Sequence, residues 1–177
     1  MAVLPIRKFG DPVLRERAQV VVEVTDVHRR LAADMLETMR ATGKGVGLAG
    51  NQVGVVERIF VWEVGEEHGA VINPVITDRS DETFIDDEGC LSLPGIYYPV
   101  ERAMRVTVEG VDEHGDPVKL EAEEFMARVC QHEIDHLDGV LFVDRLTSEN
   151  RKAAMAELRD QALGLPRSPS RATKEAL

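Results

Sequence analysis

The sequence predicts an α+β protein, because strand-like and helix-like segments follow one another without regular β-α-β units. Apolar residues recur every four positions over residues 27–39, as in an amphipathic helix, whereas residues 58–64 are almost continuously apolar, as in a covered strand. The 177 residues, 44% of them hydrophobic, are enough for one domain with a sizeable core. We therefore expect a single domain over residues 1–164.

The first elements are two helices with recognisable start signals. Asp11 is placed as an N-cap with Pro12 at the first helical position, which predicts a short helix to about Arg17. Thr25 can cap a longer helix that ends before Gly43. On this second helix the residues at four-residue spacing are expected to form a buried stripe: Val27, Leu31, Met35 and Met39.

Strands are expected in the middle of the chain, and helices near its end. Residues 58–64 and 70–72 are predicted strands, the acidic stretch 78–88 a loop, and residues 104–109 and 117–120 a hairpin around the turn 113–116. A helix over about residues 123–137 is apolar on several sides, so it should be buried. Ser148 can cap a last helix to about Leu163, and residues 165–177 are expected to form a disordered tail.

The helix predicted at 123–137 carries the pattern His132-Glu133-Ile134-Asp135-His136. The two histidines lie one turn apart and about 40° around the helix axis, so both imidazoles can reach one divalent cation. Glu133 would lie beside the cation, where it can take a proton from a water that the metal makes acidic. The pattern therefore indicates metal-assisted hydrolysis. The less favoured interpretation is that two surface histidines have this spacing by chance.

A third ligand is needed, because catalytic zinc-type sites use three protein ligands and keep one position open. Of the two cysteines, Cys130 lies two residues before His132 on the same helix and points about 200° away from it. Cys130 is therefore expected to be a small buried hydrophobe. Cys90 lies in the turn-rich segment 88–95 and is the predicted third ligand, with a packed free thiol as the alternative.

Residues 43–54 contain five glycines, where the backbone must turn tightly or approach another segment closely. The stretch lacks the Gly-Lys-Ser/Thr ending of a P-loop, so phosphate binding is not favoured. Gln52 is the more informative residue, because a neutral amide can donate a hydrogen bond to a developing oxyanion. The alternative interpretation is that Gln52 is an ordinary polar loop residue.

Taken in order, the three clusters resemble the motifs of the peptide deformylases. The family pattern G-x-G-L-A-A-x-Q corresponds to residues 45–52, E-G-C-L-S to residues 88–92, and Q-H-E-x-D-H to residues 131–136. The resemblance implies a metal-dependent hydrolase that removes the N-formyl group from formyl-methionyl peptides. It also implies antiparallel sheets wrapped around a central metal-binding helix. Gly50 and Asn51 depart from the pattern, and we expect them to alter loop mobility while Gln52 is retained.

The resemblance assigns roles to individual residues. Cys90, His132 and His136 would bind the metal, and Glu133 would be the general base and acid. Gln52 and the backbone N–H of Leu91 would form the oxyanion hole. The family implies Fe²⁺ as the native metal, with Zn²⁺, Ni²⁺ or Co²⁺ as substitutes, and this donor set suits all four.

Residues around the metal are expected to hold the substrate. Helical geometry places Phe125 and Val129 about 20° and 60° from the direction of His132, so they can line an apolar pocket for a methionine-like side chain. The backbone around Val46, Gly47 and Gly89 could hold the peptide in an extended pose. Glu88 and Asp135 could orient ligands, with Arg102 as a partner, and three histidines are expected at the surface: His28, His68 and His114.

Composition limits the partners and the location. The net charge of −11 argues against broad nucleic-acid affinity. No apolar run reaches about 18 residues and the first residues lack a signal-peptide core, so we expect a cytoplasmic protein without a membrane span. Residues 151–177 nevertheless carry six basic and three acidic residues. They are interpreted as a solvated helix and tail, with contact to ribosomal RNA as the alternative that the resemblance adds.

Two other functions remain as alternatives. A zinc endopeptidase would use the same His-Glu-x-x-His pattern with a downstream third ligand, for which Glu157 is available. The cluster around Cys90 would then have no role. A deformylase-like protein that binds metal or peptide without turnover is the second alternative, motivated by Gly50 and Asn51.

Overall fold

The computed structural model describes residues 2–165 and confirms the predicted α+β class. Strands and helices alternate irregularly, and all strand pairs are antiparallel. The helices are α1 (Asp26–Ala41), α2 (Glu124–Leu137) and α3 (Ser148–Ala162), with short 3₁₀ turns η1 (Pro12–Arg15), η2 (Gly50–Val53) and η3 (Phe142–Arg145). The strands are β1 (Gly47–Ala49), β2 (Ile59–Val64), β3 (Glu67–Arg79), β4 (Thr83–Cys90), β5 (Leu93–Ala103), β6 (Arg105–Val111) and β7 (Pro117–Glu123).

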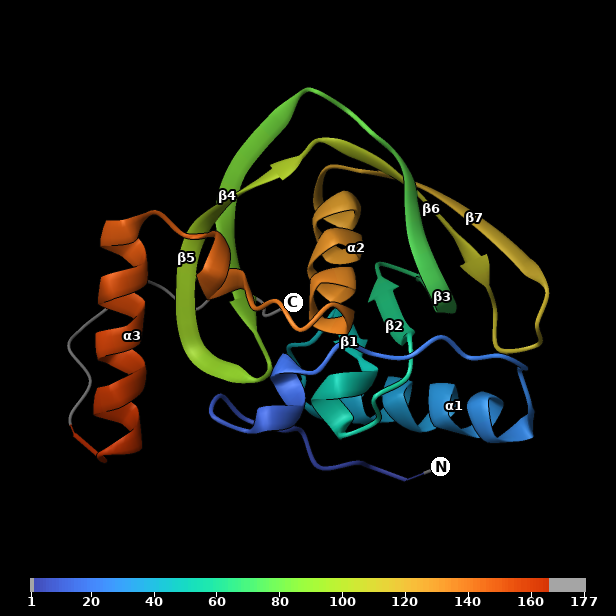
Figure 1. The fold of residues 1–177 in the computed structure, drawn as a ribbon, viewed down its shortest axis with the longest axis horizontal. Coiled ribbons are helices and arrows are strands. Elements are labelled where there is room, and N and C mark those ends of the chain that lie inside the picture. Colours follow the sequence, from blue (N-terminus) through green and yellow to red (C-terminus); the bar gives the residue numbers. More distant parts are fainter. Residues whose placement is uncertain (1, 166–177) are drawn as a thin grey trace.

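Two sheets surround α2. Five strands form one sheet in the order β1-β2-β3-β6-β7, and β4 pairs with β5 in a separate two-stranded sheet. Figure 1 shows α2 in the centre, with β4 and β5 on one side of it and the larger sheet on the other. Helix α1 lies against β1 and β2, and α3 lies against β5 at the edge of the molecule.

The core explains why α2 can be buried almost completely. Its residues Val129, Cys130 and Leu137 pack with Phe60 and Val71 of the larger sheet. Cys130 is fully buried as expected, and burial raises the pKa of its thiol to about 12, with the nearby Glu133 adding to the effect. A thiol that stays protonated and faces away from the histidines is a packing residue.

The stripe predicted for α1 is partly wrong. Met35 and Met39 are fully buried, but Val27 is 70% exposed. A four-residue step advances about 40° around a helix, so Val27 lies about 120° from Met39. The buried face instead passes through His28, which is 8% exposed. The expectation of a surface His28 was therefore wrong, whereas His68 and His114 are exposed as expected.

Hydrogen bonds account for the burial of His28. Its Nδ1 accepts from the backbone N–H of Thr25 at 3.0 Å, and its Nε2 lies 3.4 Å from a carboxylate oxygen of Glu57. Both ring nitrogens therefore have polar partners on the buried face of α1.

The acidic stretch 78–88 is not a loop, contrary to the prediction. It contains the end of β3 and most of β4, and β4 pairs with β5, a strand that the sequence patterns did not predict. Several of its acidic side chains are exposed, and a strand of a two-stranded sheet tolerates charge on its solvent side. The stretch is therefore ordered by its partner strand.

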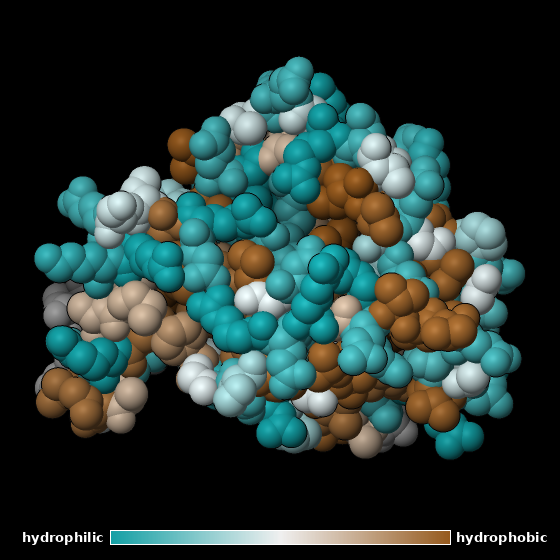
Figure 2. Space-filling model, viewed as in Figure 1, coloured by the Kyte–Doolittle hydropathy of each residue, from teal (hydrophilic) through white to brown (hydrophobic). Residues whose placement is uncertain are grey.

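The remaining elements begin close to the predicted residues. Asp11 caps η1 by accepting from Val13 N at 3.1 Å, and α3 is capped by Thr147, not by Ser148 as predicted. Among residues 2–165, no helix is long and apolar enough to cross a membrane. On the face drawn in Figure 2, hydrophobic groups are separated by hydrophilic ones. The expectation for the tail falls, except for Leu165, outside the described residues.

Candidate metal centre

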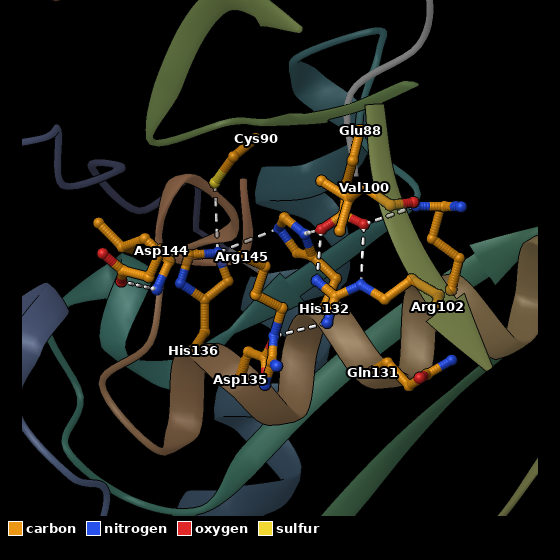
Figure 3. Close-up of polar contacts among 12 residues, drawn as sticks. Glu88, Cys90, Val100, Arg102, Gln131, His132, Asp135, His136, Asp144 and Arg145 are labelled. Carbon is orange, nitrogen blue, oxygen red and sulfur yellow. Dashed lines mark hydrogen bonds and ion pairs between the residues drawn. The ribbon is translucent and has the colours of Figure 1, made fainter. Parts of the chain in front are cut away.

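Helix α2 and the end of β4 bring three potential ligands together. His132 and His136 follow each other by one turn of α2, and Cys90 is the last residue of β4 (Figure 3). The Nε2 atoms of the two histidines are 3.2 Å apart, and the Sγ of Cys90 is 3.2 Å from Nε2 of His136. The geometry thus joins the residues that the sequence singled out.

This triangle fits a divalent cation. All three ligand atoms lie within 4.8 Å of one another and all three side chains are buried. Ligand atoms about 2.0–2.3 Å from a tetrahedral cation are separated by roughly 3.3–3.7 Å, close to the observed separations. One thiolate and two imidazoles suit zinc, iron, cobalt and nickel.

Glu88 orients the first histidine. Its Oε1 lies 2.6 Å from Nδ1 of His132, which leaves Nε2 directed toward Cys90 and His136. Arg102 donates to both carboxylate oxygens of Glu88, at 3.0 and 2.5 Å, and Arg128 donates to Oε2 at 2.9 Å. Burial alone would raise the pKa of Glu88, but His132 and Arg102 hold it well below its usual range. The carboxylate is therefore ionised.

Asp135 continues this charge network toward the surface. It accepts from Arg102 at 2.6 Å and from Nη2 of Arg145 at 2.5 Å. Arg102 therefore bridges Glu88 and Asp135, the pairing that the sequence suggested. Arg128 and Arg145 were not identified from the sequence. Arg128 lies one helical turn before His132, a spacing that could have indicated it, whereas Arg145 is in η3 and no spacing rule points to it.

The two histidines differ in their tendency to carry a proton. Burial lowers the pKa of His136 well below its usual value, and the positive charge of His132 lowers it further. For His132, burial acts in the same direction, but Glu88 and Cys90 outweigh it and raise the pKa. His136 is therefore neutral and able to ligate, whereas ligation by His132 requires that its Nε2 is free of a proton.

Glu133 lies beside the ligands and is fully buried. Within residues 2–165, neither of its carboxylate oxygens has a hydrogen-bond partner. Burial is the main reason that its pKa rises to about 7. A Cβ atom placed on Gly47 would collide with the Glu133 carboxylate, so a larger residue at this position would displace that carboxylate. An unpaired buried carboxyl group with a pKa near neutrality is suited to proton transfer.

Gln52 directs its amide group at the same centre. Its Oε1 accepts from the backbone N–H of Ala49 at 2.8 Å, which fixes the side chain. Its Nε2 then lies 3.5 Å from Sγ of Cys90 and 3.3 Å from the hydroxyl of Ser92. Ser92 was missed by the sequence analysis, although it is the last residue of the second motif. It holds the amide of Gln52 with a buried hydroxyl.

The residues expected to bind substrate differ in their burial and in the elements on which they lie. Gly47 belongs to β1, an edge strand of the larger sheet, so one side of its backbone is unpaired within that sheet. Val46 directly precedes Gly47 in the sequence, and Gly89 directly precedes Cys90. Gly89 lies close to the Tyr97 ring. Val129 is fully buried in the core and Phe125 is 39% exposed at the start of α2. Their role as a side-chain pocket remains a prediction.

The two departures in the first motif have structural partners. A Cβ atom on Gly50 would lie 2.8 Å from the carbonyl oxygen of Val55 and 2.9 Å from that of Glu57. The Asn51 side chain donates to the carbonyl oxygen of Glu16 at 2.6 Å. Both residues therefore lie close to neighbouring backbone, and the Gln52 side chain is held by Ala49.

Glu157 is placed differently from the three potential ligands. It lies on α3 and accepts a hydrogen bond from the hydroxyl of Tyr98 at 2.5 Å. The group of potential ligands found among the described residues contains Cys90 and does not contain Glu157.

Comparisons with known proteins point to one family. The family described as polypeptide deformylase matches residues 3–152. A peptide deformylase of Acidothermus cellulolyticus is 51% identical over 160 residues, which span 90% of this chain and 88% of that protein. The crystal structure of the peptide deformylase from Thermus thermophilus is 49% identical, with a TM-score of 0.83 over 90% of this chain and 94% of that chain. The enzyme from Legionella pneumophila has a TM-score of 0.86 at 36% identity, covering 95% of this chain and 100% of that one.

Proposed function

Because this chain belongs to the peptide deformylase family, which removes the N-formyl group from nascent peptides, we propose that Cys90, His132 and His136 form the metal site of that reaction. One observation carries the proposal. Two imidazole nitrogens and a thiol converge to 3.2 Å beside a carboxyl group that has no partner among the described residues. Neither a packing role nor a surface role explains that combination.

A divalent metal held by these residues would act as a Lewis acid and lower the pKa of a water toward about 7. Glu133 is the general base in this proposal, because its raised pKa lets it take a proton near neutral pH. The same carboxyl group then delivers that proton to the nitrogen of the leaving amine. Glu133 therefore serves both proton transfers.

Gln52 and the backbone N–H of Leu91 stabilise the negative charge that develops on the formyl oxygen. The position of Gln52 supports this assignment, because its oxygen is already engaged with Ala49 and only its NH₂ group faces Cys90. Leu91 follows Cys90 directly, so its N–H lies next to the same centre.

The peptide binds as an extended strand along β1. The backbone of Val46 and Gly47 supplies one side, and Gly89 supplies the other. The edge position of β1 supports this pose. The first side chain of the substrate, a methionine, lies against Phe125 and Val129.

The native metal in this proposal is Fe²⁺, with Zn²⁺, Ni²⁺ or Co²⁺ as substitutes. Thiolate ligation of iron makes the site sensitive to air, because iron, sulfur or both can be oxidised. We expect the iron form to lose deformylation activity in air while the nickel form retains it. Equal decay of both forms would remove the support for iron as the vulnerable metal.

The substrates are nascent chains, so the proposed location is the cytoplasm, where ribosomes produce them. Contact with the ribosome through residues 151–177 is part of the proposal. Arg151, Lys152 and Arg159 are exposed on α3, which supports it. A pelleting assay with ribosomes, comparing the wild type with a variant neutralised at these three positions, tests it.

The decisive experiment replaces Glu133 with alanine. We expect the variant to keep its metal and to release formate from formyl-Met-Ala-Ser roughly 10⁴-fold more slowly, because general acid-base groups contribute about 10²–10⁴-fold and one residue serves two steps. Glu66→Ala, an exposed glutamate in the turn between β2 and β3, is the matched control. A Glu133→Ala protein with a near-normal rate and unchanged metal content would overturn the assignment.

A wild-type protein that binds one metal per chain without releasing formate would favour the non-enzymatic alternative. Metal loss on changing Glu157, but not on changing Cys90, would instead favour the endopeptidase alternative.

A further inference from the structure

A cavity that opens to solvent lies on the side of α2 opposite the proposed metal ligands. Ile134 and Asp138 line it, and they lie about 180° and 140° around the helix axis from the mean direction of His132 and His136. Its volume is about 520 Å³. The N-terminal segment forms one wall as it crosses the carboxyl end of α2, and β3 forms the other (Figure 1). The lining consists of Arg17, Ala18, Val20, Arg58, Pro74, Val75, Ile76, Arg79, Ile134 and Asp138.

Asn73 holds the two walls in place. Its backbone has φ of 54°, and the pairing of β3 with β6 shifts register between Ile72 and Val75. The Asn73 amide bonds twice to Val21, accepting from its N–H and donating to its carbonyl oxygen, both at 2.8 Å. A bulge fixed in this way redirects the strand beside the cavity. The cavity is therefore a built feature, held by specific hydrogen bonds.

The walls combine exposed apolar side chains with arginines. Val20 is 65% exposed and Val75 is 58% exposed. Arg58 donates to Asp138 at 2.7 Å, but Arg17 approaches the same carboxylate only to 3.9 Å. Within residues 2–165, Arg79 has no carboxylate partner in hydrogen-bond range. The lining thus contains three arginines and a single carboxylate, in a protein whose net charge is −11.

From this lining we propose that the cavity binds a small molecule with a carboxylate on a short aliphatic body. A guanidinium fork matches a carboxylate in two-point geometry. The valines and Ile134 offer apolar surface for the aliphatic part. The volume lies in the range of small-molecule sites, about 300–1,000 Å³. Nucleic acid fits less well, because phosphates and sugars gain little from apolar walls.

Hexanoate is a suitable probe for this ligand class. Titration of hexanoate into the isotope-labelled, metal-loaded full chain should shift the methyl signals of Val20, Val75 and Ile134. Hexanol and acetate, which lack the charge and the apolar body respectively, should each bind at least about tenfold more weakly. Equal binding of hexanoate and hexanol would overturn the proposal.

Arg79→Gln is the critical variant. We expect it to weaken hexanoate binding roughly tenfold or more, because it removes a charged hydrogen-bond donor. Arg105→Gln is the matched control, an exposed arginine of β6 that pairs with Glu82 and should leave hexanoate binding unchanged. Both variants should deformylate formyl-Met-Ala-Ser at the normal rate.

Other outcomes also decide the matter. Shifts near Cys90 that are insensitive to Arg79→Gln would mean that hexanoate binds the metal centre, and would overturn the proposal. Binding of a short single-stranded RNA at Val20 and Val75, without binding of hexanoate, would assign the cavity to nucleic acid instead. Val75→Asp provides a second variant that should abolish hexanoate binding through like-charge repulsion.

Discussion

The two sides of α2 differ in the kind of side chain that they bury: one is apolar and the other is charged. Toward the five-stranded sheet the helix presents Val129, Cys130 and Leu137, which pack in an apolar core. Toward β4 and β5 it presents Arg128, His132 and Asp135, which meet charged partners in almost complete burial. The apolar side stabilises the helix by removing surface from water. The charged side determines where the imidazoles point.

This difference teaches how each side tolerates change. Removing one methyl group from a buried apolar residue, as in Ile→Val, leaves a small cavity and costs about 0.5–1.5 kcal/mol. Removing one member of a buried charge network leaves its partners without compensation, which costs much more. On the charged side, every charged residue therefore needs its partner. On the apolar side, the side chains only have to fill the available volume.

Glu88→Gln should give the largest effect on stability. Arg102, Arg128 and His132 would face a neutral amide while buried, and breaking such a network costs about 3–5 kcal/mol. The matched change on the apolar side, Ile134→Val in α2, should cost only about 0.5–1.5 kcal/mol. Urea unfolding of the metal-free proteins measures both. Similar costs for the two variants would contradict the comparison.

Gly50→Ala should have an intermediate effect. The added methyl group would meet two backbone carbonyl oxygens at 2.8 and 2.9 Å, and overpacking of this kind costs about 1–3 kcal/mol. Thermal unfolding measures the loss, and formate release shows whether Gln52 is displaced. An unchanged or raised unfolding temperature would mean that the glycine is not required by its neighbours.

Asp144→Asn should have the smallest effect, because Asp144 lies in η3, outside the buried network, and pairs with the partly exposed Arg15 and Arg151. Burial raises the pKa of Asp144, but the Arg15 side chain and the Leu141 N–H outweigh it, so the folded pKa lies below the ordinary value of 3.8. Its stabilisation is therefore present above about pH 3.8 and is lost as the pH falls through the folded value.

At pH 7 we expect the Asn variant to be less stable by about 1 kcal/mol or less, because partly exposed ion pairs contribute little. The difference should shrink when unfolding is repeated at successively lower pH below 3.8. A difference that stays constant with pH would mean that the charge of Asp144 does not contribute.

The sequence predicted those features of the fold and the site that depend on local patterns. The helix containing His132 and His136 was placed within one residue at its start and matched at its end, because its apolar periodicity and its ligand spacing agree. Cys90 was separated from Cys130 by helical geometry alone. These predictions needed no knowledge of contacts between distant segments.

What the sequence did not predict depends on such contacts. Strand β4 was interpreted as an acidic loop, because its order comes from pairing with β5. Arg145 reaches Asp135 through the turn η3, and Ser92 reaches Gln52 across 40 positions of the chain. His28 is buried because positions spaced by four residues advance about 40° around the helix at each step. The predicted four-residue spacing ignored this advance.

The most direct test of the account is metal binding by the two cysteine variants, Cys90→Ala and Cys130→Ala. Both thiols are buried, but only Cys90 lies within reach of the two imidazoles. Metal content per chain and affinity for Co²⁺ are measured on each folded protein. We expect Cys130→Ala to hold one metal per chain with near-normal affinity, and Cys90→Ala to lose it. A Cys90→Ala protein that still holds one metal per chain with unchanged affinity would contradict the proposed site.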